Sequence, residues 1–88
     1  SILGTIGDSY VQKGETESAL SYFEKAAKSD NVMVATTYLL KLARAYESLN
    51  QNDKALATYQ TIKTQYKDVL PGIADVDDVD KFINALSK

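Results

Sequence analysis

The chain has 88 residues, 44% of them hydrophobic and 25% charged, a composition typical of a globular domain rather than a disordered or membrane-spanning one. At this length it forms at most one small domain, which buries about 60–65% of the surface of the unfolded chain. It has no cysteine and no histidine, which excludes disulfides, thiolate or imidazole metal ligands, and catalysis by either side chain.

The charge is unevenly distributed along the chain. Residues 1–74 carry eight acidic and eight basic side chains, whereas residues 75–88 carry four acidic and two basic ones, so the net charge of −2 comes entirely from the end. Such a chain offers no basic surface, and we expect no nucleic-acid partner. No apolar run approaches the roughly 20 residues of a membrane span, so we expect no membrane insertion by this segment.

The first predicted elements are two helices joined by a short turn. Residues 2–12 carry apolar side chains at helical spacing, namely Leu3, Ile6 and Tyr10. Gly7 allows another helix to approach closely, and Gly14 suits a left-handed residue at the helix end. Thr16 is the expected N-cap of a second helix that extends to about Lys28. The expected buried side chains of this second helix are Ala19, Leu20, Phe23, Ala26 and Ala27.

A second pair of helices is predicted next. The third helix covers about residues 33–49, and the fourth covers residues 54–66 after a polar turn, with Asp53 as its N-cap. The third helix is expected to bury Leu39, Leu42, Ala43 and Tyr46. The fourth is expected to bury Ala55, Leu56, Tyr59, Ile62 and Tyr66. Tyr22 and Tyr38 are less constrained by the helical spacing.

The spacing of apolar residues near the end of the chain predicts one more helix. Pro71-Gly72 indicates a turn or a helix start, and residues 75–87 form an expected amphipathic helix with Asp75 as its cap. Its apolar side chains at helical spacing are Val76, Val79, Ile83 and Leu86. We therefore predict an all-α fold of two antiparallel helix pairs and a final helix. The chain enters its first helical pattern at once, and we expect it to be a fragment of a longer protein.

The first helix pair recurs in the second with an offset of 36 residues. Nine positions of the first pair (residues 6–10, Gly14, Ala19, Phe23 and Ala26) match residues 42–46, Asn50, Ala55, Tyr59 and Ile62. A fixed period between about 20 and 50 residues is typical of stacked repeat architectures. The alternative is an unrelated five-helix bundle whose packing happens to repeat.

This repeat resembles the tetratricopeptide repeat (TPR) family, which has a period of about 34 residues. The family's Trp, Leu-Gly, Tyr, Ala and Phe positions hold Leu3, Ile6-Gly7, Tyr10, Ala19 and Phe23 in the first repeat. In the second repeat they hold Leu39, Leu42-Ala43, Tyr46, Ala55 and Tyr59. The resemblance implies a TPR-type superhelix in a single domain over residues 1–88, with repeat one at about 1–31, repeat two at about 33–66 and a capping helix at about 75–87. The family's Pro after the second helix is missing from both repeats.

Three longer stretches, residues 3–10, 22–27 and 78–83, are similar to a narrower group. This group consists of bacterial TPR proteins with an N-terminal membrane anchor, related to the ancillary subunit of the Sec translocon. The resemblance implies that the chain is the C-terminal part of such a protein in the bacterial cell envelope. The residues themselves indicate no compartment.

No pattern in the sequence predicts a catalytic, cofactor-binding or metal-binding site. The acidic run of residues 75–80 lacks the Gly and Glu that a calcium-binding loop needs at its sixth and twelfth places, where Asp80 and Leu86 stand. Acidic residues in the first turn of a helix are the ordinary consequence of the helix dipole. We therefore predict no cofactor and no enzymatic activity.

The family resemblance also implies a concave groove, lined by the first helix of each repeat. Its groove-facing positions in this chain are Asp8, Val11, Gln12, Thr37, Leu40, Arg44, Glu47 and Ser48, together with Gly4. This mixture of polar and apolar side chains suits a peptide or protein segment. Family members that bind carboxylate tails use Lys and Asn where this chain has Gly4 and Asp8, so we expect no carboxylate clamp. The alternative is that these residues are merely solvated.

The predicted function is therefore a protein–protein interaction module that binds a peptide or protein segment of unknown identity in this groove. The alternative function is structural. Apolar residues of the first helix would then pack on further N-terminal repeats or form a homo-oligomer. These residues are Ile2, Leu3 and Ile6.

Overall fold

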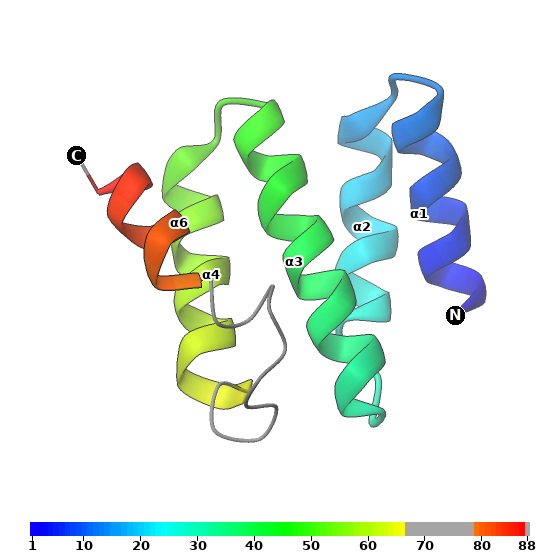
Figure 1. The fold of residues 1–88 in the computed structure, drawn as a ribbon. Coiled ribbons are helices and arrows are strands. Elements are labelled where there is room, and N and C mark those ends of the chain that lie inside the picture. The colour runs from blue at the N-terminus through cyan, green and yellow to red at the C-terminus, as the bar shows by residue number, and fades with distance from the viewer. Residues whose placement is uncertain (67–78, 88) are drawn as a thin grey trace.

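The computed structural model describes residues 1–66 and 79–87, and Figure 1 shows them as a row of helices in which each helix packs against the next. The helices are α1 (Ile2–Gln12), α2 (Thr16–Ala26), α3 (Val32–Ser48), α4 (Asn52–Tyr66) and α6 (Val79–Leu86). α1, α3 and α6 run in one direction, and α2 and α4 run in the other. The described residues contain no strand, and the predicted all-α fold with antiparallel helix pairs is confirmed.

Both helix pairs are joined by the same tight turn. Gly14 and Asn50, which lie 36 residues apart, have positive φ angles of 79° and 60°. In each turn the following residue donates its backbone N–H to the carbonyl five residues earlier, which is the Schellman way of ending a helix. These hydrogen bonds join Glu15 to Tyr10 at 2.8 Å and Gln51 to Tyr46 at 2.9 Å. The left-handed residue predicted at Gly14 is confirmed, and Asn50 takes its place in the second pair.

The same turn explains why two predicted N-caps are wrong. Thr16 is the first residue of α2 and is preceded by the cap residue Glu15, while α4 begins at Asn52, so that Asp53 lies inside its first turn. In each pair a single residue, Glu15 or Gln51, donates the backbone N–H that ends the first helix and also directly precedes the second helix. No separate capping residue therefore fits between the two helices. α3 does have such a residue, because the Asn31 side chain accepts a backbone N–H at 3.1 Å.

The bounds of α1 are as predicted, and the other helix bounds agree with prediction to within two residues where the structure describes them. α2 ends at Ala26 rather than at about Lys28, and α3 covers Val32–Ser48 rather than about 33–49. The predicted final helix is described over Val79–Leu86. The predictions at Pro71-Gly72 and Asp75 lie outside the described residues. Among the described helices, none is long and apolar enough to cross a membrane.

The core lies between the helices and follows the repeat. Phe23 and its counterpart Tyr59 are buried, and so are Ala19 and its counterpart Ala55. Small residues bring the paired helices close together, because a Cβ at Gly7 would lie 2.6 Å from Cε1 of Phe23. Such close packing of apolar side chains is the main source of stability for short helices in water.

Tyr38, which the helical spacing does not assign to the core, is held firmly by its neighbours in the structure. Its ring is buried and stacks on Phe23 of α2, with ring centroids 5.9 Å apart. A Cβ added to Gly4 of α1 would overlap the same ring. Gly4, which the family resemblance placed in the groove, is therefore covered by Tyr38, and this contact joins α1, α2 and α3 at one point.

α6 packs against α4 at the end of the row opposite α1 (Figure 1). Val79 is buried in this contact, and the ring of Phe82 lies with its centroid 5.1 Å from that of Tyr59. An ion pair at 2.8 Å between Lys63 and Asp80 joins the two helices at the surface. The apolar side of the final helix is thus turned toward α4.

Candidate protein-binding groove

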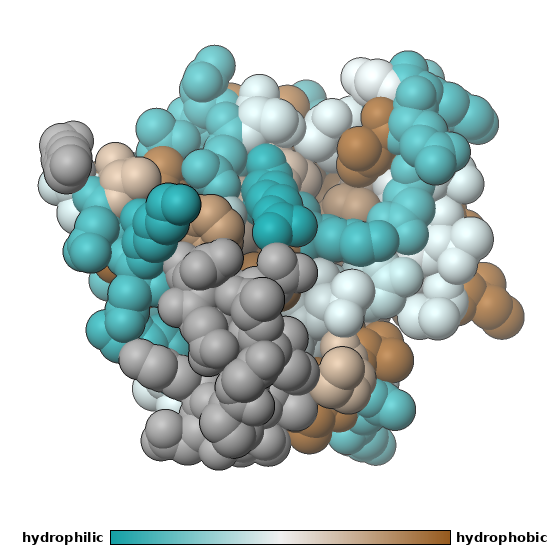
Figure 2. Space-filling view, viewed as in Figure 1, coloured by the Kyte–Doolittle hydropathy of each residue, from teal (hydrophilic) through white to brown (hydrophobic). Residues whose placement is uncertain are grey.

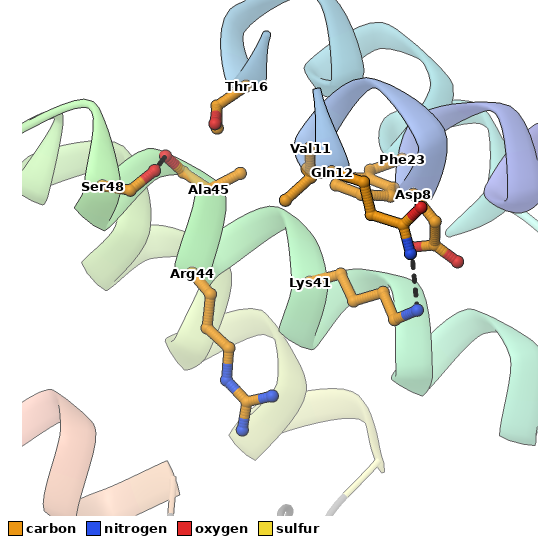
Figure 3. Close-up of a pocket in the computed structure, with 9 residues that line it drawn as sticks. All are labelled: Asp8, Val11, Gln12, Thr16, Phe23, Lys41, Arg44, Ala45 and Ser48. Carbon is orange, nitrogen blue, oxygen red and sulfur yellow. Dashed lines mark hydrogen bonds and ion pairs between the residues drawn. The ribbon is translucent and has the colours of Figure 1, made fainter. Parts of the chain in front are cut away.

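A groove of about 500 Å³ lies between α1 and α3, with α2 behind it (Figure 3). Its lining residues are Asp8, Val11, Gln12, Thr16, Phe23, Lys41, Arg44, Ala45 and Ser48. α1 supplies the first three of these residues, α2 supplies Thr16 and Phe23, and α3 supplies the other four. The groove therefore lies between the equivalent first helices of the two repeated pairs.

Three apolar side chains from three helices form the floor of the groove. Val11 of α1 is 42% exposed, whereas Phe23 of α2 and Ala45 of α3 are buried. Phe23 approaches α1 this closely because Gly7 has no side chain. A partner side chain that covers Val11 would therefore remove apolar surface from water without burying an unpaired polar group of the floor.

An ion pair joins the two walls of the groove. Lys41 Nζ of α3 lies 2.8 Å from Asp8 Oδ1 of α1, as the dashed line in Figure 3 marks. The same ammonium group lies 5.1 Å from the centroid of the Tyr38 ring. Since the two side chains are 37% and 35% exposed, the pair contributes only about 0–1 kcal/mol to stability. The ion pair has a larger effect on the charge of the groove, because the positive charge of Lys41 and the negative charge of Asp8 cancel there.

Two charged residues of α3 are held on the side of α4 and α6. Figure 3 shows the Arg44 side chain pointing away from Lys41, and its Cζ lies 6.0 Å from the centroid of the Phe82 ring. Glu47 accepts a hydrogen bond from the Tyr59 hydroxyl at 2.5 Å. Burial raises the pKa of Tyr59, and the Glu47 carboxylate adds to the shift while Arg44 opposes it. The contact of Glu47 lies within the second repeat, the contact of Arg44 joins that repeat to α6, and neither joins the two repeats.

Five of the eight residues predicted from the sequence come together in this groove: Asp8, Val11, Gln12, Arg44 and Ser48. The other three do not line it. Thr37 is exposed, and its hydroxyl donates to the Met33 carbonyl at 2.8 Å. Leu40 is only 5% exposed and belongs to the core, while Glu47 is bound to Tyr59. The role of all eight in binding stays a prediction.

Four lining residues were missed by the sequence reasoning. Lys41 and Ala45 lie four residues apart on the α3 face that also carries Ser48, so helical periodicity could have found both. The sequence predicts Phe23 in the core and Thr16 at a helix cap. Nothing in the sequence indicates that these two α2 residues are reached from the groove, because that depends on where three helices meet.

The polar groups of the groove suit hydrogen bonding rather than metal chemistry. Gln12 and Thr16 supply uncharged donors and acceptors, and Ser48 supplies an acceptor because its hydroxyl donates to the Ala45 carbonyl at 2.9 Å. Asp8 is the single carboxylate among the lining residues. Within residues 1–66 and 79–87, no group of three or more His, Cys, Asp or Glu side chains could hold a metal ion. The lining residues therefore offer apolar contact and hydrogen bonds, and no metal ligand set.

The row of helices, its repeated turns and the groove between equivalent helices define a helical-repeat protein. The tetratricopeptide repeat family matches residues 10–74, which is more than half of the chain, and the chain belongs to that family. The family predicted from the repeat is thereby confirmed. TPR domains are in general protein–protein interaction modules, and they are typically scaffolds rather than enzymes. Comparisons with curated proteins and with solved structures gave no match.

Proposed function

We propose that this TPR domain binds a peptide or protein segment in the groove between α1 and α3. An apolar side chain of the partner would lie on the floor formed by Val11, Phe23 and Ala45. The observation that carries the proposal is the groove itself, a space of about 500 Å³ with an apolar floor and a polar rim. Sites that bind ligands commonly have this composition, with a few polar groups that fix orientation.

The polar groups favour a partner segment with little charge. Asp8 and Lys41 neutralise each other at 2.8 Å, and the third charged lining residue, Arg44, points away from Lys41 with its Cζ 6.0 Å from the centroid of the Phe82 ring. Gln12 can exchange hydrogen bonds with the backbone of a bound segment, and the Ser48 hydroxyl, which donates to the Ala45 carbonyl at 2.9 Å, can still accept one. Gly4 is covered by the Tyr38 ring, which supports the expectation that the groove has no clamp for a terminal carboxylate.

Selection of peptides from a random display library on the intact chain tests this proposal. The selected peptides should share an apolar residue flanked by polar ones. They should bind the Val11→Glu variant at least about tenfold more weakly, because a carboxylate would have to be buried against the apolar floor. Met33→Glu is the matched control, since Met33 is an apolar residue of α3 that is 54% exposed and does not line the groove.

The Met33→Glu control separates loss of binding in the groove from a general effect of a new carboxylate on the surface. Peptides that bind Met33→Glu like the wild type and Val11→Glu weakly support the groove. Peptides that bind Val11→Glu and the wild type equally well bind elsewhere, and the assignment of the groove is then wrong.

We also propose that the domain is the C-terminal part of a bacterial envelope protein related to the ancillary subunit of the Sec translocon. The support is the similarity of residues 3–10, 22–27 and 78–83 to that group. Fractionation of cells that produce the full-length protein tests the proposal. The protein should be recovered with the membranes and released by detergent but not by salt; recovery in the soluble fraction would contradict it.

A second, structural function is supported by the outer face of α1, which we define as Ile2, Leu3 and Ile6. Ile2 is 83% exposed, and Leu3 and Ile6 are 37% and 36% exposed. Figure 2 shows apolar surface at the edge of the molecule that α1 forms near the N-terminus. Exposed apolar groups of this kind favour contact with another helix, either of further repeats or of a second copy of the chain.

Light scattering over a range of protein concentrations tests the self-association version. A mass that rises with concentration in the wild type and stays monomeric in Ile6→Glu supports contact between copies. A wild-type chain that is strictly monomeric at high concentration rules that version out and leaves contact with further repeats.

A further inference from the structure

Arg44 belongs to the groove by its position on α3 and to α6 by the direction of its side chain. It lines the groove together with Lys41 and Ser48, because residues three and four apart share one face of a helix. Its side chain nevertheless points away from Lys41 (Figure 3), and its Cζ lies 6.0 Å from the centroid of the Phe82 ring of α6. A charged group on the groove face of α3 is therefore turned toward another helix.

Side chains of three helices favour this direction of the guanidinium. A guanidinium within about 6 Å of a ring centroid is attracted by the ring, and the Phe82 ring is itself packed on Tyr59, with centroids 5.1 Å apart. Glu47 lies three residues after Arg44 on α3, a spacing at which opposite charges attract each other on a helix. The Arg44 guanidinium also lies close enough to the Tyr59 hydroxyl to oppose the rise in its pKa. Phe82 is the contribution that α6 makes to this set.

The direction of Arg44 decides which charge a bound segment meets. The other two charged lining residues, Asp8 and Lys41, cancel each other at 2.8 Å. While the guanidinium lies on the α6 side, its charge is directed at Phe82 rather than at the floor of the groove. The arginine side chain is long and has several rotatable bonds, so rotation about them can carry the guanidinium to the groove without movement of the backbone. There it would form charge-assisted hydrogen bonds with a carboxylate of the bound segment.

We propose that Phe82 of α6 is a positioning residue that sets which segments the groove accepts. Its ring keeps the Arg44 guanidinium on the α6 side, and the groove then takes segments without an acidic residue beside the apolar one. Without that ring the guanidinium turns to the groove, and segments with such an acidic residue bind more tightly. By linkage, a bound acidic segment weakens the contact of Arg44 with α6 to the same degree. The inference rests on the function proposed for the groove and adds the charge of the bound segment to it.

Pairs of peptides that differ in one charge test this inference. Peptides selected on the intact chain, whose binding Val11→Glu weakens, are made with Glu or with Gln at each position next to their apolar residue in turn. Isothermal titration calorimetry then gives the ratio of the two Kd values. The wild type should bind no Glu version more tightly than its Gln version. Phe82→Leu, which keeps an apolar side chain on Tyr59, should bind the Glu version about fivefold more tightly at one of these positions, since the cation–π contact is lost.

Two further variants separate this role of Phe82 from a general loosening of α6. Arg44→Gln added to Phe82→Leu should return the ratio of Kd values to that of the wild type, because the charge that prefers the Glu version is gone. Lys63→Gln removes the ion pair with Asp80 that joins α4 to α6, and it leaves the Phe82 ring in place. The Lys63→Gln chain should therefore keep the wild-type ratio. A ratio that changes in this control as it does in Phe82→Leu assigns the effect to α6 as a whole and overturns the positioning role of Phe82.

A second readout needs no peptide. Arg44 is the single arginine of the chain, so its side-chain Nε–Hε signal is identified in a nuclear magnetic resonance spectrum without further assignment. In the wild type the ring current of Phe82 should displace this signal. In Phe82→Leu the signal should move to the position of a solvated arginine, and in Lys63→Gln it should stay where it is in the wild type.

The outcomes separate the inference from the function on which it rests. If Val11→Glu weakens the binding of no selected peptide, the assignment of the groove is wrong and the inference falls with it. If peptides do bind in the groove but Phe82→Leu leaves the ratio of Kd values or the Arg44 signal unchanged, the groove stands and the positioning role of Phe82 is wrong.

Discussion

The substitution Gly4→Ala tests whether α1 approaches Tyr38 as closely as the structure shows. In the interior of an exposed helix, Ala is favoured over Gly by about 0.8–1 kcal/mol, so the change would normally stabilise α1. At Gly4 the added methyl would overlap the Tyr38 ring, which is buried and stacked on Phe23. The ring has to move, and the expected sign of the effect is reversed.

The magnitude follows from three contributions. Overpacking of a well-packed site costs about 1–3 kcal/mol, and loss of an aromatic pair costs about 0.5–1.5 kcal/mol. Set against the gain in helix propensity of about 1 kcal/mol, the free energy of unfolding should fall by about 0.5–3.5 kcal/mol. For a domain of this size each kcal/mol lowers the Tm by roughly 4–8 °C.

The assay is thermal unfolding followed by circular dichroism for the wild type, Gly4→Ala, Tyr38→Ala and the double variant. Without the Tyr38 ring the added methyl has space, so Gly4→Ala should raise the Tm of the Tyr38→Ala chain while it lowers that of the wild type. This reversal of sign measures the interaction directly. If Gly4→Ala raises the Tm in both chains, the close contact does not exist in solution and the reasoning is wrong.

Three further predictions concern the ion pair, the turns and the buried tyrosine. Asp8→Asn should reduce the free energy of unfolding by no more than about 1 kcal/mol, and the difference should nearly vanish in about 1 M salt, whereas a larger loss would mean a desolvated pair. Gly14→Ala should cost roughly 1 kcal/mol because the position has a φ of 79°, while Asn50→Gly, with a φ of 60°, should be neutral or slightly stabilising in urea unfolding. Because burial and Glu47 raise the pKa of Tyr59, its neutral form stabilises the fold fully below about pH 10, and this contribution is lost as the pH rises through the higher folded-state value. The wild type should therefore lose stability faster than Tyr59→Phe above about pH 10, and parallel pH profiles of the two chains would contradict the assignment.

Most of the fold could be predicted because its determinants are local and repeated. Helical spacing gave the bounds of α1, and the 36-residue offset predicted that the two pairs pack alike. The N-caps at Thr16 and Asp53 were wrong for a specific reason. A separate cap residue is the general rule for a helix, but here the residue after Gly14 or Asn50 both ends one helix and precedes the next.

The groove could be predicted only in part, because it depends on contacts between residues that are distant in sequence. Lys41 forms an ion pair with Asp8, which lies 33 residues away in sequence. Glu47 accepts a hydrogen bond from the Tyr59 hydroxyl, which lies 12 residues away. Leu40 was assigned by its family position, yet it belongs to the core between the helices. Periodicity tells which residues share a face of one helix, but it does not tell where that face meets a neighbouring helix.

The most direct test of the proposed function is a titration of the isotopically labelled chain with a selected peptide, followed by backbone amide chemical shifts. The largest shifts should occur at the groove residues of α1 and α3, with Val11 and Ala45 among them, and should fit a single Kd. The outer face of α1 at Ile2 and Ile6 should change little. Large shifts on that face or on α6, with the groove residues unchanged, would contradict the central claim.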